Sequence, residues 1–372
     1  MKKIVSFLTL IAILFTLTAC DLPWFTNTPD GPEKPGNDVP VTPEDPGDGG
    51  EELPLEPETP ACTHDYVEIG RTEAKPLSDG VIISECTLCK EQTTEVHTPM
   101  TRSLKILAIG NSHSENAVAY LWDICNQAGI KNLVIGNAVV GGTGLDDHGS
   151  YILYGTPAYS YTKYEKGKTE KVDKVKIDVA LLDEEWDYIT IQQRSPYVAD
   201  SRFTLLDTII DRLNVKCPDA EIFWHMTWAY EENANMGQSI KNDFVNQFGS
   251  DTTVMYDAII DSVEAQVLTR DKIAGVIPAA TVMQNMRSSY LGNNITTDGV
   301  HAKNGMAKYA IALLWYSVFT GGSLEQVEWL PGTAASKESI LEHYDVIIET
   351  VENALKNPYE VTPSQYTTAP AK

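Results

Sequence analysis

From residue 104 onward the sequence alternates short apolar runs with segments of helical periodicity, and this alternation limits the fold more than any other feature. The apolar runs lie at residues 104–109, 133–140, 188–191 and 221–226. Strands that alternate with helices are typical of a mostly parallel sheet whose two faces are covered by helices. The sequence therefore predicts one α/β domain over residues 101–360, followed by a C-terminal tail at 361–372.

Two helical segments of this domain are clear from their apolar patterns. Residues 115–128 place apolar side chains three and four positions apart along one helical face, and Gly129 provides a stop. A long apolar segment at 304–319 predicts a further helix near the end of the domain. Cys125 and Cys217 lie in helical or helix-ending patterns, where we expect small core side chains rather than ligands. Their separation leaves a disulfide between them open.

Polar clusters follow three of the predicted strands, at Gly110–Ser114, Gly141–Gly144 and Gln192–Ser195. In parallel α/β sheets, binding and catalytic groups gather beyond the carboxyl ends of the strands. Ser112 lies where the first strand turns into a helix, a position that exposes its hydroxyl and directs its N–H outward. A serine after a strand is more commonly a helix cap, so Ser112 alone does not define an active site.

A second motif, Thr297-Asp298-Gly299-Val300-His301, precedes the last apolar helix. An aspartate three residues before a histidine can orient the imidazole through Nδ1 and leave Nε2 free to accept a proton from a serine. The two motifs together predict a catalytic triad of Ser112, Asp298 and His301. Such a triad needs no cofactor for catalysis.

These motifs resemble those of the SGNH/GDSL hydrolases. Gly110-Asn111-Ser112 stands in for the Gly-Asp-Ser of that superfamily, and Asp298-x-x-His301 resembles its closing block. A longer pattern, from Gly141 to His301, resembles an uncharacterised SGNH-like branch found in bacterial surface lipoproteins. The resemblance implies a three-layer α/β/α, flavodoxin-like fold and the activity of a serine esterase.

The resemblance also implies an oxyanion hole made by Ser112, by a glycine after the second strand and by an asparagine after the third. Gly142 fits the glycine better than Gly141 does. The Gly-x-Asn-Asp block expected after the third strand is absent, and Gln192-Gln193 lies there instead. Because a glutamine amide can donate the same hydrogen bond, we expect Gln193 to complete the hole, with Gln192 as the second choice.

A separate cluster of cysteine and histidine residues lies between residues 62 and 100. Cys62, His64, Cys86 and Cys89 are the donor types that bind zinc tetrahedrally, and a short Cys-x-x-Cys segment can present two sulfurs to one ion. The β-prone run at 81–83 predicts a small β-ribbon. A ribbon of this length has little hydrophobic core and needs a bound metal or a disulfide for stability. Structural zinc is the expectation. Disulfides in an oxidising compartment are the alternative.

The N-terminus predicts export. Lys2 and Lys3 precede an apolar or hydroxylated run that ends at Cys20, which is typical of a signal peptide over residues 1–20. The residues before Cys20 resemble a lipobox, which implies lipidation of Cys20 and a secreted lipoprotein at the cell surface or outer face of the membrane. A cleaved signal with an incidental cysteine is the alternative. Residues 21–61 hold ten prolines and eleven acids, which predicts a disordered tether.

The net charge and the predicted location restrict the classes of partner that this protein can bind. A net charge of −24 argues against nucleic acid, whose backbone would be repelled. Five tyrosines between Tyr151 and Tyr164 suit stacking on sugar rings, and a packed hairpin gives the same pattern. We therefore expect an acylated glycan or another small ester as substrate, with acetyl as the acyl group, and membrane association through the lipid. A non-catalytic glycan-binding protein on the same scaffold is the alternative.

Four further polar residues lie near predicted strand ends or in loops. Each is either a substrate contact or a structural group: His148, His225, Tyr230 and Arg287.

Overall fold

The computed structural model describes residues 62–99, 102–232 and 236–370. The predicted signal peptide, the lipidation site Cys20 and the tether at 21–61 lie outside the described residues. In the described part of the chain, no helix combines the length and the apolar character that a membrane crossing requires.

Residues 62–99 form a small antiparallel ribbon, as the sequence predicts. Its strands are β1 (Tyr66–Thr72), β2 (Gly80–Cys86) and β3 (Gln92–His97), with β2 in the centre. Within residues 62–99 only Gly80 and Cys86 are buried. The ribbon therefore has almost no hydrophobic core of its own.

The ribbon contacts the rest of the chain through the turn that precedes β2. The N–H of Leu77 donates a hydrogen bond to the carbonyl of Thr320, at 2.8 Å. Gly321, the next residue, has a φ of +68°, and a Cβ there would lie 2.0 Å from Oγ of Ser78. Glycine is required at this position both by the left-handed backbone and by the close approach of the ribbon.

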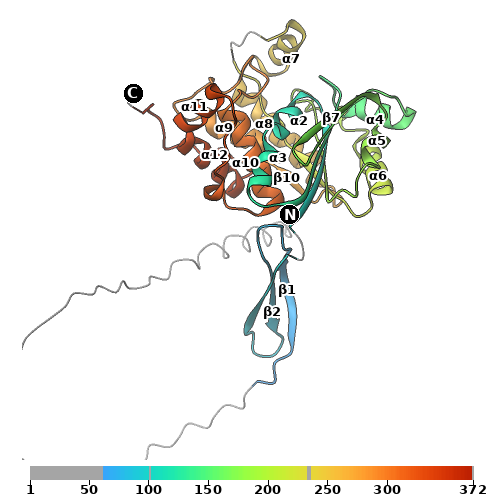
Figure 1. Ribbon diagram of the computed structural model, residues 1–372, viewed down its shortest axis with the longest axis vertical. Helices are drawn as coiled ribbons and strands as arrows, with labels where there is room; N and C mark the ends of the chain where they lie inside the picture. Colours follow the sequence, from blue (N-terminus) through green and yellow to red (C-terminus); the bar gives the residue numbers. More distant parts are fainter. Residues whose placement is uncertain (1–61, 100–101, 233–235, 371–372) are drawn as a thin grey trace, which may run out of the picture. The chain divides into compact units, whose positions relative to one another are not determined.

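The main sheet has seven strands in the order β10-β9-β8-β4-β5-β6-β7. The parallel strands are β4 (Ser103–Gly110), β5 (Lys131–Val139), β8 (Tyr188–Ile191), β9 (Glu221–His225) and β10 (Gly275–Ile277). From the β5 side, these strands follow the chain order second, first, third, fourth, fifth, which is the flavodoxin-like arrangement. The predicted three-layer α/β/α fold is thus confirmed (Figure 1).

An antiparallel hairpin extends this sheet beyond β5. It consists of β6 (Tyr159–Glu165) and β7 (Lys168–Val175). Tyr159 and Tyr161 alternate inward from β6 and are 0% and 5% exposed. The packed-hairpin interpretation therefore holds for the tyrosines of β6, whereas Tyr151 and Tyr154 lie on helix α4 (Leu145–Tyr154) and Tyr154 is 82% exposed. The outermost strand, β7, is exposed and carries three lysines, which discourage pairing with another sheet edge.

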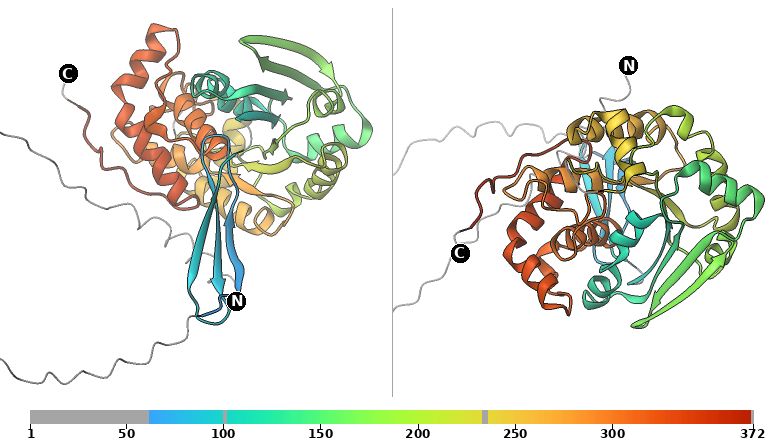
Figure 2. Two further views of the ribbon diagram at one scale, coloured as in Figure 1. Left: turned by 60° about the horizontal axis from the view of Figure 1, so that its bottom comes forward. Right: turned by 90° about the horizontal axis from the view of Figure 1, so that it is seen from above.

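Helices cover both faces of the sheet (Figure 2). One face carries α2 (Ser112–Val118), α3 (Leu121–Gln127), α9 (Ala279–Arg287), α10 (Met306–Thr320), α11 (Ala334–Glu342) and α12 (Tyr344–Lys356). The remaining helices are α4 (Leu145–Tyr154), α5 (Ile177–Leu181), α6 (Leu206–Lys216), α7 (Gln238–Phe248) and α8 (Thr252–Gln266), with short 3₁₀ turns η1 (Asp200–Arg202) and η2 (Leu324–Gln326). Helix α10 is buried on nearly all sides because α2, α3, α9 and α12 pack around it.

The single helix expected over residues 115–128 is two helices, α2 and α3. Both bury the same apolar face, so the break leaves the hydrophobic periodicity unchanged and no sequence signal marks it. The hydroxyl of Tyr120, at the break, accepts a hydrogen bond from the N–H of Gly305 at 3.2 Å. Cys125 is fully buried, as expected for a core residue, and Cys217 is partly buried. Both thiols are free, so the disulfide between them is not formed.

Three histidines lie inside the domain. Burial lowers the pKa of His113 and His225 to about 3 and that of His148 to about 4. His148 is satisfied, because its ring bonds to the hydroxyls of Tyr159 and Thr143 at 2.9 and 3.2 Å. His225 packs against Trp315, and neither of its ring nitrogens has a hydrogen-bond partner among the described residues.

These lowered pKa values predict a loss of stability in acid. The unfolded chain binds a proton at each histidine near its ordinary pKa of about 6.5, whereas the folded chain does not, so stability falls as the pH drops below that value. Replacing His225 by Phe removes one such group. We expect the loss of unfolding free energy between pH 7 and pH 5 to be smaller in His225→Phe by about 2 kcal/mol.

Urea unfolding at the two pH values measures this difference. His148→Phe serves as a contrast. It also weakens the acid dependence, but it lowers stability at pH 7 because the buried Tyr159 hydroxyl loses its partner and the Thr143 hydroxyl keeps only the carbonyl of Val140. An acid dependence of His225→Phe equal to that of the unsubstituted protein contradicts the prediction.

Candidate active site

The site begins at the sharp turn between β4 and α2. A Cβ on Gly110 would lie 2.5 Å from the side chain of Gln192, so only glycine fits where the end of β8 approaches this turn. Asn111 caps α2, and its side chain accepts a hydrogen bond from the N–H of His113 at 2.9 Å. Ser112 is the first residue of α2 and is partly exposed.

Asn111 connects the ends of three neighbouring strands. Its Nδ2 donates to the carbonyl of Thr143, beyond β5, at 2.9 Å. Its Oδ1 accepts from Nε2 of Gln192, beyond β8, at 2.8 Å. A carboxylate only accepts hydrogen bonds, so an aspartate here could not donate to Thr143. The asparagine that departs from the Gly-Asp-Ser pattern therefore has its own positioning role.

Asp298 and His301 lie on a short loop that closes on itself before α10. Thr296 pairs with Ala302 in an antiparallel bridge, and the N–H of Thr297 donates to the carbonyl of His301 at 2.9 Å. Gly299 at the tip has a φ of +85°, which favours glycine. The Oδ1 atom of Asp298 accepts from the N–H of His301 at 2.8 Å.

The structure brings Ser112, His301 and Asp298 into one hydrogen-bonded line. Nε2 of His301 lies 2.8 Å from Oγ of Ser112, and Nδ1 lies 2.7 Å from Oδ2 of Asp298. Partial burial alone raises the pKa of Asp298, but hydrogen bonds from His301 and Val300 outweigh it and hold that pKa below its ordinary value. Asp298 is therefore ionised at neutral pH, as an orienting carboxylate must be.

A neutral histidine lies beside this line. The rings of His113 and His301 are 6.1 Å apart, and Nδ1 of His113 lies 3.1 Å from Oδ1 of Asn111. Burial, followed by the neighbouring His301 and His225, lowers the pKa of His113 to about 3. His113 therefore carries no charge that would oppose protonation of His301.

Three contacts from other elements hold the Asp298 loop, and the sequence did not reveal them. Oδ1 of Asn116 accepts from the N–H of Ala302 at 2.7 Å. Nε1 of Trp228 donates to the carbonyl of Val300 at 2.7 Å, and the N–H of Glu231 donates to the carbonyl of Gly299 at 2.8 Å. Asn116 lies four residues after Ser112, on the same side of α2. This spacing is the one signal that could have pointed to it.

The structure does not bring Gln193 to Ser112. Its Nε2 donates to the carbonyl of Arg202 at 2.9 Å, and its Oε1 accepts from the N–H groups of Leu145 and Arg194. The side-chain amide is thus bonded to backbone groups of these three residues and is not directed to Ser112, as an oxyanion donor would be. The second choice, Gln192, donates its Nε2 to Asn111 instead.

Gly142 lies in the exposed turn between β5 and α4, with a φ of +70°. The neighbouring Thr143 carbonyl is bonded to Asn111, which ties this turn to the start of α2. Among the other candidates, Tyr230 is 1% exposed. Arg287 bonds to Asn293, Gln284 and the carbonyl of Ala229, so it is a structural group.

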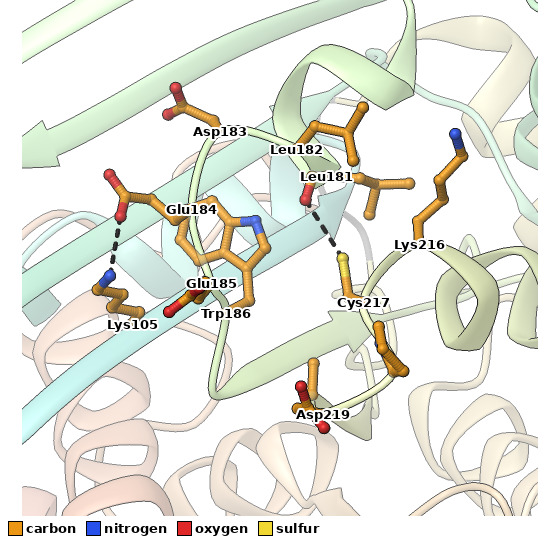
Figure 3. Close-up of a pocket in the computed structure, with 12 residues that line it drawn as sticks. Lys105, Leu181, Leu182, Asp183, Glu184, Glu185, Trp186, Lys216, Cys217 and Asp219 are labelled. Carbon is orange, nitrogen blue, oxygen red and sulfur yellow. Dashed lines mark hydrogen bonds and ion pairs between the residues drawn. The ribbon is translucent and has the colours of Figure 1, made fainter.

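A cleft at the opposite edge of the sheet is shown in Figure 3. It is lined by Lys105 at the start of β4, by Trp186 before β8 and by Ala220 before β9. These are the amino ends of the strands, whereas the triad lies at their carboxyl ends. Lys105 is paired with Glu184 at 3.0 Å and Cys217 donates to the carbonyl of Leu181, so the polar groups of this cleft are largely satisfied.

The four predicted metal ligands also lie together, far along the ribbon from its contact with the domain. The donor atoms of Cys62, His64, Cys86 and Cys89 are all within 4.8 Å of one another, and the three thiols are free. The predicted lipidation site, Cys20, is not among the described residues.

Comparison with known proteins gives a family. Residues 105–346 match DUF4886, a domain of unknown function. The crystal structure of a DUF4886 family protein from Bacteroides uniformis ATCC 8492 is 30% identical, covers 72% of this chain and 100% of that chain, and has a TM-score of 0.63. A protein provisionally described as a GDSL-like lipase, from Parabacteroides merdae ATCC 43184, is 12% identical, covers 59% and 99% of the two chains and has a TM-score of 0.37. No curated protein matches the sequence. Because the family match spans more than half of its length, this chain belongs to the DUF4886 family.

Proposed function

We propose that this chain is a serine esterase of the SGNH type. The observation that carries the proposal is the line of hydrogen bonds from Ser112 Oγ through His301 to Asp298, with distances of 2.8 and 2.7 Å. A serine, a histidine and a carboxylate in this geometry form an activated nucleophile on many unrelated folds. The Gly110-Asn111-Ser112 and Asp298-x-x-His301 motifs support a relationship to the SGNH/GDSL hydrolases in particular.

The chemistry follows from the roles of the three side chains. Ser112 Oγ attacks the carbonyl carbon of the ester while its proton passes to Nε2 of His301. Collapse of the tetrahedral intermediate breaks the bond to the alcohol, which leaves with the proton from Nε2. Water then attacks the acyl-serine and gives a proton to the same nitrogen. Collapse of this second tetrahedral intermediate breaks the bond between the acyl carbon and Ser112 Oγ, which takes the proton back from Nε2 as the acid leaves. Asp298 stays ionised throughout and holds the imidazole through Nδ1.

Hydrogen-bond donors must stabilise the negative charge of the tetrahedral intermediate. The N–H groups of Ser112 and Gly142 are our candidates, because both lie on turns that Asn111 joins and Gln193 is turned away. A hole made from backbone donors alone supplies less stabilisation than one with an added side-chain amide, since each donor contributes roughly 3 kcal/mol. This difference favours slow turnover. It also keeps open the alternative of a non-catalytic glycan-binding protein on the same scaffold.

The substrate class is part of the proposal. A secretion signal with lipidation at Cys20 would place the domain at the cell surface or the outer face of the membrane, where acylated polysaccharides are accessible. We infer that acetyl groups on extracellular glycans are the substrates. The tyrosines of β6 do not contribute to this inference, because Tyr159 and Tyr161 are buried.

Covalent labelling separates the esterase from the binding protein. A fluorophosphonate reacts with a serine that a histidine activates, so we expect the purified protein to be labelled and Ser112→Ala to be unlabelled. Ser150→Ala is the matched control, because its hydroxyl only bonds to the carbonyl of Asp146, and it should label fully. An unlabelled wild-type protein supports the binding alternative, and labelling that persists in Ser112→Ala excludes Ser112 as the nucleophile.

The substrate proposal has its own test. We expect the wild-type protein to release acetate from an acetylated polysaccharide and Ser112→Ala to release none. Release is measured by an enzymatic acetate assay, with the same polysaccharide after chemical deacetylation as the control. If no acetylated polysaccharide is cleaved although Ser112 is labelled, the protein is an esterase of other esters and the glycan proposal fails.

Asn116 should act as a positioning residue. Its Oδ1 holds Ala302, the residue after His301, so Asn116→Ala frees the imidazole to move away from Ser112. We expect kcat for 4-nitrophenyl acetate to fall by about 10²-fold with little change in KM, as small misplacements of a catalytic group do. Asn116→Asp keeps the acceptor and should restore most of kcat. Asn126→Ala, on the exposed side of α3, is the control, and equal kcat values in all four proteins contradict the role.

A further inference from the structure

The ribbon of residues 62–99 poses a physical problem, because its strands are held by little besides their backbone hydrogen bonds. Strand β1 is exposed along most of its length, and Tyr66, Val67 and Ile69 are each more than a third exposed. A unit of this size without a core is unstable in water unless a disulfide or a metal supplies the missing energy. The only buried side chain in residues 62–99 with a chemical function is the thiol of Cys86.

The distances among the four donor atoms distinguish a zinc site from a disulfide. Sγ of Cys62 lies 3.8 Å from Sγ of Cys86, and Sγ of Cys89 lies 3.4 Å from Nδ1 of His64. A tetrahedral zinc ion with Zn–S bonds of about 2.3 Å and a Zn–N bond of about 2.05 Å requires separations of about 3.8 Å between sulfurs and about 3.5 Å between sulfur and nitrogen. A disulfide requires sulfurs about 2.05 Å apart. The cluster thus has the spacing of a tetrahedral metal site.

The backbone around Cys86 and Cys89 is shaped to hold this spacing. The N–H of Lys90 donates to the carbonyl of Cys86 at 3.0 Å, which closes the turn. Lys90 itself has a φ of +66°, a conformation that costs a non-glycine residue free energy. The N–H of Thr87 donates to the carbonyl of Asp65 at 2.8 Å, which joins the turn to the segment that carries His64. These backbone contacts fix the turn that carries Cys86 and Cys89 next to the segment that carries His64.

The carboxylate of Glu91 lies next to the His64 ring, on the side away from the sulfurs. Nδ1 of His64 faces the sulfurs, and Nε2, on the other side of the ring, lies 3.4 Å from a carboxylate oxygen of Glu91. Histidine ligands commonly donate their second N–H to a carboxylate, which fixes the ring and strengthens the metal bond. Glu91 also accepts, through its backbone carbonyl, the N–H of Cys86 at 2.8 Å.

We propose that Cys62, His64, Cys86 and Cys89 bind one zinc ion, oriented by Glu91, and that this ion is what keeps the ribbon folded. Four protein donors leave no open coordination position, so the zinc is structural. It takes no part in the ester chemistry at Ser112, and the two proposals stand or fall separately.

Metal analysis of the full-length protein, purified under reducing conditions without added metal, tests the site. We expect one zinc per chain in the wild-type protein and less than a tenth of that in Cys86→Ser and Cys89→Ser. Cys217→Ser is the matched control, because this thiol lies in the α/β domain, and it should keep one zinc. Zinc retained in Cys86→Ser overturns the proposal. So does a metal-free wild-type protein whose mass is two hydrogens low, or one that holds another metal.

Two further measurements test the roles of Glu91 and of the ion. Glu91→Ala should release zinc to a competing chelator at about 10–100-fold lower chelator concentration. Glu95→Ala, on exposed β3, should behave as wild type, and equal release from both variants removes Glu91 from the proposal. Chelation should make residues 62–99 sensitive to protease while the α/β domain resists. A ribbon that still resists protease after zinc is lost contradicts the folding role.

Discussion

The parallel pairing of β4 with β5 on one side and β8 on the other is the constraint on which the candidate site depends. Parallel neighbours end at the same edge of a sheet, so the turns that follow these three strands meet. Asn111 fixes their relative positions, because it donates to Thr143 and accepts from Gln192 while it caps α2. Ser112 is the next residue, and its position is therefore set by backbone pairing in the sheet.

Short-range sequence patterns were enough to predict some features of the fold and of the candidate site. The strands β4, β5, β8 and β9 follow from apolar runs, and Asp298 and His301 meet because they are three residues apart on a closed loop. Strand β10 spans only Gly275–Ile277, too few residues for a recognisable run. The break between α2 and α3 was invisible for a different reason, since it changes no buried position.

The direction of a side chain was harder to predict than its place. The position of Gln193 in the motif indicates the strand end at which it lies, but not where its side chain points. The buried amide must form hydrogen bonds, and it forms them with backbone groups of Leu145, Arg194 and Arg202. Asn116 and Trp228 escaped prediction because each bonds to a backbone atom, 186 and 72 residues away. A backbone partner can belong to any residue type, so no complementary residue in the sequence marks such a pair.

The two parts of the described chain are stabilised by different physics. The α/β domain has a large apolar core around α10, whereas the ribbon has donors for a metal and almost no core. The ribbon contacts the domain at Thr320, the last residue of α10, and His301 lies five residues before Met306, the first residue of that helix. A helix of 15 residues is about 22 Å long, so the ribbon joins the domain well away from the triad.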